Sequence, residues 1–325
     1  MKINKLILIC AIYVIIYLYY KNIRYTHNKI NEDFNGEDKC KYISSRGFLK
    51  ICDIKSNNPI SSSSSLETYN LDDIVDGSIV YICNSAIRRF ANYLKSIDKK
   101  IILVSGDSDT TIYKDLFNSY DDFLNFIESD KIIIWFSQNC IVNHPKIIKL
   151  PIGLAYHSNI DISNKLDPVT QENTLIDIIK NCKPFEERIL LAYSNFHFSS
   201  IARYGYDRQD AINNIPKDLV YYENNRKGRK ETYENQSKYA FVISPHGNGY
   251  DCHRTWEALI LGCIPIVKKS NLDDLYIDLP VLIVNNWSDI TLELLEKTIK
   301  DYKNKIFNYD KLTLKYWIDK INSYK

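Results

Sequence analysis

From Ser78 to the C-terminus, short uninterrupted apolar runs alternate with segments in which apolar residues recur every three or four positions. Short apolar runs between polar turns are typical of buried strands, whereas the second spacing is typical of helices with one buried face. In the first half of the chain this pattern predicts strands at Ile79–Cys83, Ile101–Val104, Ile132–Phe136 and Ile147–Leu150, and helices at Ile87–Ile97 and Asp121–Glu128.

A second series of alternating runs follows Pro184. It predicts strands at Ile189–Ala192, Leu219–Tyr222, Phe241–Ser244, Ile264–Val267 and Val281–Val284. It also predicts helices at Arg208–Asn214, Glu231–Tyr239, Arg254–Gly262, Leu272–Tyr276, Thr291–Tyr302 and Lys311–Tyr324. The intervening region, 155–187, is polar, and we place a domain boundary there, with a first domain at 71–180 and a second at 181–325.

Strand–helix alternation of this kind predicts an α/β protein with two Rossmann-like domains, each built on a parallel sheet. Two such domains bind a ligand in the cleft between them, where the carboxyl ends of the strands meet. The net charge of +2 argues against nucleic acid as a partner. The cysteines form no C-x-x-C pair, so the spacing of structural zinc sites is missing and we expect no resident metal.

The N-terminus carries an uncharged apolar run, Leu6–Tyr20, with lysines on both sides. A helix of this length is about 22 Å long, shorter than the ~30 Å core of a bilayer, but flanking lysines and tyrosines extend its reach. No small-residue cleavage pattern follows, which argues against a cleaved signal peptide. We expect a cytoplasmic tail and signal anchor at 1–24 and a polar stem at 25–70, of which Tyr42–Ile54 is apolar enough to pack on the body.

The segment Phe241–Val267 points most directly to a ligand. It predicts a buried strand, a glycine turn, a helix capped by Asp251, and a return strand. A glycine turn before a helix exposes N–H groups at the positive end of the helix dipole, and such an arrangement binds anions. Side chains that suit a diphosphate, and a carboxylate that suits ribose hydroxyls, gather there: His246, Gly247, Asn248, Gly249, His253, Arg254 and Glu257.

This segment matches neither the G-x-G-x-x-G nor the P-loop fingerprint. A surface ion pair between Arg254 and Glu257 is the alternative that requires no ligand. Six of the ten arginines fall between Arg188 and Arg254, and arginine is the residue that phosphate recognition favours. Arg208 and Arg229 belong to this group and are further candidates for the diphosphate.

The segment from Tyr239 to Ile283 resembles the C-terminal domain of exostosin-type glycosyltransferases. The matching residues are Tyr239-Ala-Phe-Val-Ile-Ser-Pro, Gly247, Arg254, Glu257-Ala-Leu and Gly262-Cys-Ile-Pro-Ile-Val, preceded by Leu191-Ala-Tyr-Ser194-Asn and Arg208. The resemblance implies a GT-B fold, a nucleoside diphosphate sugar donor, inversion at the sugar, and a type II anchor in the ER or Golgi. It assigns the donor ribose to Glu257 and the diphosphate to Arg254.

Glycosyl transfer also requires a base for the acceptor hydroxyl of a glycan or glycoprotein. Asp107 and Asp109 follow a predicted strand of the first domain and are the candidates, with His144 and His157 as weaker ones. The basic groups of the second domain can replace a divalent cation, so no cofactor besides the donor is expected. Two alternatives remain: a GT-A transferase whose Asp107-Ser-Asp109 holds a metal ion, and a carbohydrate-binding module without catalysis.

Overall fold

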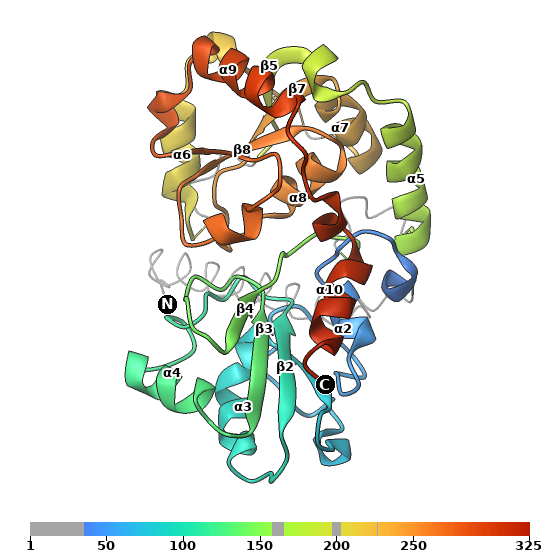
Figure 1. Cartoon of the computed structure of the whole chain (residues 1–325), viewed down its shortest axis with the longest axis vertical. Coiled ribbons are helices and arrows are strands. Elements are labelled where there is room, and N and C mark those ends of the chain that lie inside the picture. Colours follow the sequence, from blue (N-terminus) through green and yellow to red (C-terminus); the bar gives the residue numbers. More distant parts are fainter. Residues whose placement is uncertain (1–35, 158–165, 197–202, 226) are drawn as a thin grey trace, which may run out of the picture.

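The computed structural model describes residues 36–157, 166–196, 203–225 and 227–325. Within these ranges the chain forms two parallel sheets, one of four strands and one of five, with helices packed on them. Figure 1 shows the two sheets in two lobes along the long axis of the molecule, with the C-terminal chain returning to the lobe of the first sheet. The predicted α/β class with two parallel sheets is confirmed.

The first sheet has the strand order β1-β2-β3-β4, and all neighbours are parallel. On one face of this sheet the strands pack against α3 (Ile87–Leu94) and α4 (Tyr120–Ile127). The strands β1 and β2 are buried along their whole length, which explains their uninterrupted apolar sequences. The four strands are β1 (Ile79–Cys83), β2 (Ile101–Gly106), β3 (Ile132–Ser137) and β4 (Ile147–Lys149).

The other face of the first sheet is covered by two segments that are far apart in the sequence. Helices α2 (Gly47–Ile51) and α10 (Leu314–Asn322) pack there in one core with the strands. The two segments are also joined directly, because Ile43 N donates to Leu312 O at 3.1 Å. The expectation that Tyr42–Ile54 packs on the body is confirmed, and the described part of the predicted stem belongs to the first lobe.

The second sheet has the order β6-β5-β7-β8-β9 and is parallel throughout. Because β5 lies between β6 and β7, the chain passes from β5 to β6 on one side and then crosses back to β7 on the other side of β5. Ligands of open α/β sheets bind at such a switch point, outside the carboxyl ends of the strands. The strands are β5 (Ile189–Ser194), β6 (Val220–Tyr222), β7 (Tyr239–Ile243), β8 (Ile264–Lys268) and β9 (Leu282–Val284).

Two pairs of helices pack on the second sheet. Helices α6 (Gly205–Asn214) and α9 (Leu292–Lys303) share one core with its strands. Helices α7 (Arg229–Gln236) and α8 (His253–Ile260) belong to the core that continues into the first lobe. The helix expected around residue 274 is a short 3₁₀ helix, Asp273–Tyr276. Because the core around α7 and α8 also contains residues of the first sheet, the two lobes share a continuous hydrophobic core.

Helix α5 (Pro168–Lys180) occupies the polar region where the sequence pattern predicted no element. Asp167 caps this helix, because its carboxylate accepts from Thr170 N at 3.0 Å. The buried side chain of Glu172 accepts the N–H groups of residues 41 and 42, at 2.8 and 2.9 Å. Figure 1 shows α5 beside α7 and running toward the first lobe, so this helix connects the two lobes.

The predicted membrane anchor, Leu6–Tyr20, lies outside the described residues. Among the residues that are described, no helix combines the length and the apolar character needed to cross a bilayer.

Candidate functional site

The carboxyl ends of the two sheets meet at the junction between the lobes. The segment after β3 reaches the loop after β7, because Asn139 Oδ1 accepts from Asp251 N at 2.9 Å. The segment after β2 reaches the start of α6, where the hydroxyl groups of Thr111 and Tyr204 lie 2.9 Å apart. The loops that follow β2, β3 and β7 therefore lie together at the interlobe junction.

The loop 245–252 connects β7 to α8, and side chains pack closely against two of its glycines. A Cβ atom on Gly247 would lie 2.6 Å from Nη2 of Arg208. A Cβ atom on Gly249 would lie 2.8 Å from Oδ1 of Asn139. Glycine at these positions leaves room for the Arg208 guanidinium and for Asn139 of the first lobe to pack against the loop backbone.

The N–H groups of this loop fall into two sets. His246 N donates to Asp207 Oδ2 at 2.8 Å and Gly247 N donates to Gly249 O at 3.1 Å, so these groups are engaged within the protein. The N–H groups of residues 248–250, and of His253 and Arg254 in α8, have no acceptor in the described part of the chain. The second set can therefore donate to an anion, whereas the first set is already engaged.

Asp251 joins the loop to the first lobe instead of capping α8. Its carboxylate accepts from Ile152 N at 2.7 Å and from Trp256 Nε1 at 2.8 Å. Cys252 is the N-cap residue of α8, and no side chain caps the helix. Burial raises the pKa of Asp251 to about 7. The predicted cap is therefore wrong, and the N–H groups of His253 and Arg254 at the start of α8 stay without an acceptor among the described residues.

Two arginines from different helices approach the start of α8. Arg254 donates to Pro245 O at 3.3 Å, and its guanidinium lies 5.4 Å from the ring centre of Phe196, just after β5. Arg208, on α6, donates to His246 O at 3.2 Å. Because these contacts are made at the ends of β5 and β7, both positive charges lie at the switch point of the second sheet. They can neutralise a diphosphate there.

Glu257 lies one turn further along α8 and is half-buried. Its Oε1 atom accepts from Tyr233 OH at 3.0 Å, whereas Oε2 has no partner among the described residues. Burial raises the pKa of Tyr233 well above its ordinary value, so this hydroxyl remains a donor. One oxygen of Glu257 is therefore held in place and the other is able to accept from a ligand.

Two further predicted residues bind the first lobe. His253 Nδ1 lies 2.6 Å from Gly153 O, and burial lowers the pKa of His253. Arg229, at the start of α7, donates to Ala155 O at 2.9 Å and to the side chain of Gln171. Arg229 thus bridges the lobes, and its charge also acts to lower the pKa of His253.

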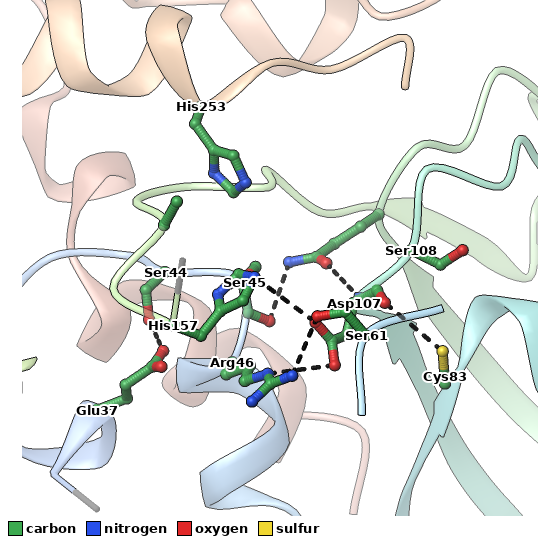
Figure 2. A network of polar contacts seen from close by, with 12 residues as sticks. Glu37, Ser44, Ser45, Arg46, Ser61, Cys83, Asp107, Ser108, His157 and His253 are labelled. Atoms are coloured by element: carbon green, nitrogen blue, oxygen red, sulfur yellow. Dashed lines mark hydrogen bonds and ion pairs between the residues drawn. The ribbon is translucent and has the colours of Figure 1, made fainter. Parts of the chain in front are cut away.

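Asp107 turns into the first lobe, as Figure 2 shows. Its Oδ2 atom lies 3.2 Å from Arg46 Nε, and its Oδ1 atom accepts from Ser61 Oγ at 2.9 Å. The Arg46 side chain is 0% exposed and that of Asp107 is 3% exposed. Asp107 adopts a positive φ of 52°, and its N–H group donates to Gln138 Oε1 at 3.1 Å. Since both carboxylate oxygens are engaged, Asp107 is part of a buried ion pair and not an accessible base.

His157 lies between this ion pair and the second lobe (Figure 2). Its Nδ1 atom is 3.1 Å from Ser45 Oγ, and its Nε2 atom is 4.0 Å from Asp107 Oδ1. Its ring centre is 6.2 Å from that of His253 across the junction. Burial, with the charge of Arg46 acting in the same direction, lowers the pKa of His157 well below its ordinary value. The imidazole is therefore neutral near pH 7.

Asp109 faces the second lobe. Its carboxyl group hydrogen-bonds the side chain of Asn248 and lies near the charges of Arg203 and Arg208. Desolvation raises the pKa of Asp109, and these positive charges oppose the increase. Asp107 and Asp109 thus point to different surroundings. Among the described residues no group of three or more His, Cys, Asp or Glu side chains is arranged to hold a metal ion.

The two remaining candidates differ in location. Ser194 ends β5 at the switch point, is fully buried, and its hydroxyl has no partner among the described residues. His144 lies on the α4 side of the first lobe, with its ring centre 6.3 Å from that of Phe123 and its Nε2 atom 3.8 Å from Glu128. His144 therefore does not join the other candidates.

Sequence reasoning missed Arg46 and Tyr233. Arg46 is a charged residue within the apolar stretch Tyr42–Ile54, and a buried arginine requires a carboxylate partner, so this position carried a usable signal. Tyr233 lies in a polar helix, and nothing in the sequence pairs it with Glu257.

Comparison of the chain with models of known protein families gives no match. Comparison with curated proteins finds no similar protein. The resemblance of Tyr239–Ile283 to exostosin-type transferases therefore stays a prediction.

Proposed function

We propose that this protein is a GT-B-like glycosyltransferase that moves a sugar from a nucleoside diphosphate sugar to a glycan or glycoprotein. The observation that carries the proposal is the grouping of unengaged N–H groups, Arg254, Arg208 and the anchored carboxylate of Glu257 around α8. Anion donors beside an acceptor for hydroxyl groups suit a diphosphate linked to ribose. The resemblance to exostosin-type transferases supports the same assignment.

In this proposal the donor lies across the switch point of the second sheet. The diphosphate binds the N–H groups of His253 and Arg254 and the two guanidinium groups. Oε2 of Glu257 accepts a ribose hydroxyl while Tyr233 holds Oε1. The sugar then points toward the first lobe, where the acceptor binds.

In the transfer step the acceptor oxygen forms a bond to the anomeric carbon while the bond from that carbon to the phosphate oxygen breaks. The nucleoside diphosphate leaves with the electron pair, and the proton of the acceptor hydroxyl passes to a base of the first lobe. Attack opposite the leaving group inverts the anomeric carbon. Asp109 is the proposed base, because it faces the second lobe whereas Asp107 is engaged with Arg46.

The leaving diphosphate is stabilised by groups that are already in place before the reaction, which is the arrangement that lowers a barrier most effectively. Positive charge from Arg254 and Arg208 takes the part that a divalent cation plays in other transferases, so the proposal includes no metal. We further propose that residues 6–20 anchor the protein as a single-pass type II membrane protein of the ER, Golgi or an equivalent endomembrane.

The decisive experiment incubates the full chain with a panel of nucleoside diphosphate sugars and measures the released nucleoside diphosphate. Release from one donor, retained in EDTA, is the expected result. No release from any donor would overturn the enzymatic assignment, and saccharide binding without release would favour the carbohydrate-binding module. Activity that EDTA abolishes and Mn²⁺ restores would favour the metal-dependent alternative at Asp107 and Asp109.

Glu257→Gln tests the donor site itself. Loss of a charge-assisted hydrogen bond to ribose should weaken donor binding about 10- to 100-fold, measured by calorimetry, with an unchanged melting temperature. Tyr233→Phe should weaken it less, by about 10-fold at most, because it frees the carboxylate without removing it. The matched control is Glu296→Gln on the exposed face of α9. A collapse of the melting temperature with unchanged donor affinity would make Glu257 a structural residue.

A further inference from the structure

A cavity of about 460 Å³ opens at the junction of the lobes on the α6 side. Its volume is in the range of sites that bind small molecules. Both lobes contribute to it, and its walls are rich in cationic and aromatic side chains. We call it the basic tyrosine pocket, and the residues used below are Lys114, Arg203, Tyr206, Tyr250, Lys268 and Lys269.

Two of the four cations in this pocket are neutralised by the protein. Arg203 forms an ion pair with Asp115, and Lys268 Nζ lies 2.8 Å from Asp210 Oδ2. The other two cations, treated next, carry the argument for an anionic ligand.

Lys114 of the first lobe and Lys269 of the second are exposed. Within the described part of the chain neither has a carboxylate within 4.0 Å. Two uncompensated cations that converge on one cavity from different lobes favour an anion between them.

One carboxylate, that of Asp207, also lines the pocket, and its charge acts on Lys268. Asp207 accepts from His246 N and from Trp287 Nε1, both at 2.8 Å, and is almost fully buried. Its two oxygens are therefore engaged by protein donors. Four cations (Lys114, Arg203, Lys268 and Lys269) stand against three carboxylates (Asp115, Asp207 and Asp210), so the pocket keeps a net positive charge.

Three tyrosine rings also line the pocket, those of Tyr204, Tyr206 and Tyr250. Tyr206 is 82% exposed, so its ring is accessible to a ligand. The ring centres of Tyr204 and Tyr250 are 4.5 Å apart, and that of His246 is 4.6 Å from Tyr250. Rigid aromatic faces of this kind bind the C–H face of a sugar ring at a low entropic cost.

We propose that the basic tyrosine pocket binds the acceptor of the transfer, and that this acceptor is an anionic saccharide. A phosphate, sulfate or carboxylate group lies between Lys114 and Lys269, and the sugar ring stacks on Tyr206. The proposal rests on the proposed function. It also agrees with the position of the proposed base, because Arg203, which lines the pocket, donates to Asp109 O at 3.5 Å.

The test measures binding of glucose, glucose 6-phosphate, glucose 6-sulfate and glucuronate to the full chain by calorimetry. At least one anionic sugar should bind about 10-fold more tightly than glucose, and the tightest identifies the anion. The double variant Lys114→Gln/Lys269→Gln should remove this preference, whereas Lys99→Gln/Lys303→Gln, at exposed lysines outside the pocket, should keep it. Equal binding of glucose and the anionic sugars, or an equal loss in the control, would overturn the proposal.

Tyr206→Ala separates stacking from charge. Because this side chain is exposed, the melting temperature should not change, while affinity for glucose and for the anionic sugars should fall by a similar factor of about 10. Unchanged affinity for all four sugars would refute the stacking role.

Release of nucleoside diphosphate separates this inference from the proposed function. Stimulation of release by the preferred anionic sugar, lost in Lys114→Gln/Lys269→Gln, would support both. If nucleoside diphosphate is released but no anionic sugar binds the protein or stimulates the release, the pocket assignment is refuted and the transferase assignment stays intact. Binding through Lys114 and Lys269 with no release from any donor would refute the acceptor role together with the transferase.

Discussion

Replacing Arg46 with Met should destabilise the protein strongly without touching the proposed donor site. The Arg46–Asp107 pair is buried on both sides, with Nε and Oδ2 3.2 Å apart. Removing one partner of a buried pair costs about 3–5 kcal/mol, because the remaining charge stays in a low-dielectric environment. Met occupies a similar volume, so lost packing adds less than about 1.5 kcal/mol.

The assay is urea unfolding of the full chain, followed by the fluorescence of its tryptophans, of which Trp135 lies fully buried in β3 of the first lobe. With a denaturant slope of about 2 kcal/mol per M, the expected loss lowers the midpoint by about 2 M. The matched control breaks an exposed pair. Lys315→Gln, in an ion pair that is 82% and 61% exposed, should cost less than about 1 kcal/mol.

Two further variants decide what the pair does. Arg46→Met/Asp107→Leu should regain most of the lost stability, because apolar residues then replace the whole pair. A loss in Arg46→Met as small as that in the control would refute the reasoning. If Asp107→Asn keeps full stability yet abolishes release of nucleoside diphosphate, Asp107 is catalytic and its assignment to a structural pair is wrong.

Two other predictions follow from the titratable groups. Burial raises the pKa of Glu37 from 4.5 to about 7, so the folded protein holds this proton more tightly than the unfolded chain does, and the free energy of unfolding falls as the pH rises from about 4.5 to 7. Glu37→Gln should flatten that decline in urea unfolding at pH 5 and pH 8, and identical slopes in both proteins would contradict it. Asp109→Asn should lower transfer about 100-fold or more while the donor dissociation constant stays the same, and unimpaired transfer would exclude Asp109 as the base.

The strands could be predicted because a strand that is buried on both faces has an uninterrupted run of apolar residues in the sequence. The local unit from β7 to β8 was also predictable, since its strand, glycine turn and helix are consecutive. Helix α5 was not, because its buried side is small and its sequence is largely polar. The signal available for it was the Asp167-Pro168 start, which places a capping residue before a proline at the first helical position.

The functional site was predictable only in its local part. The different fates of Asp107 and Asp109 depend on Arg46, which is 61 residues away from Asp107 in the sequence. The anchoring of Glu257 by Tyr233 spans 24 residues and two helices. Spacing along one helix indicates which side chains share a face, but contacts between separate elements are decided by the packing of the lobes.

The position of α10 on the first sheet has a consequence for biosynthesis. On the ribosome, strands β1 to β4 emerge long before residues 314–322, and one face of their sheet stays bare of this helix until translation has passed that point. The first lobe therefore reaches its final form last, after the second has been made. A nascent chain that stalls before α10 exposes an apolar surface, which makes it a target for chaperones and degradation.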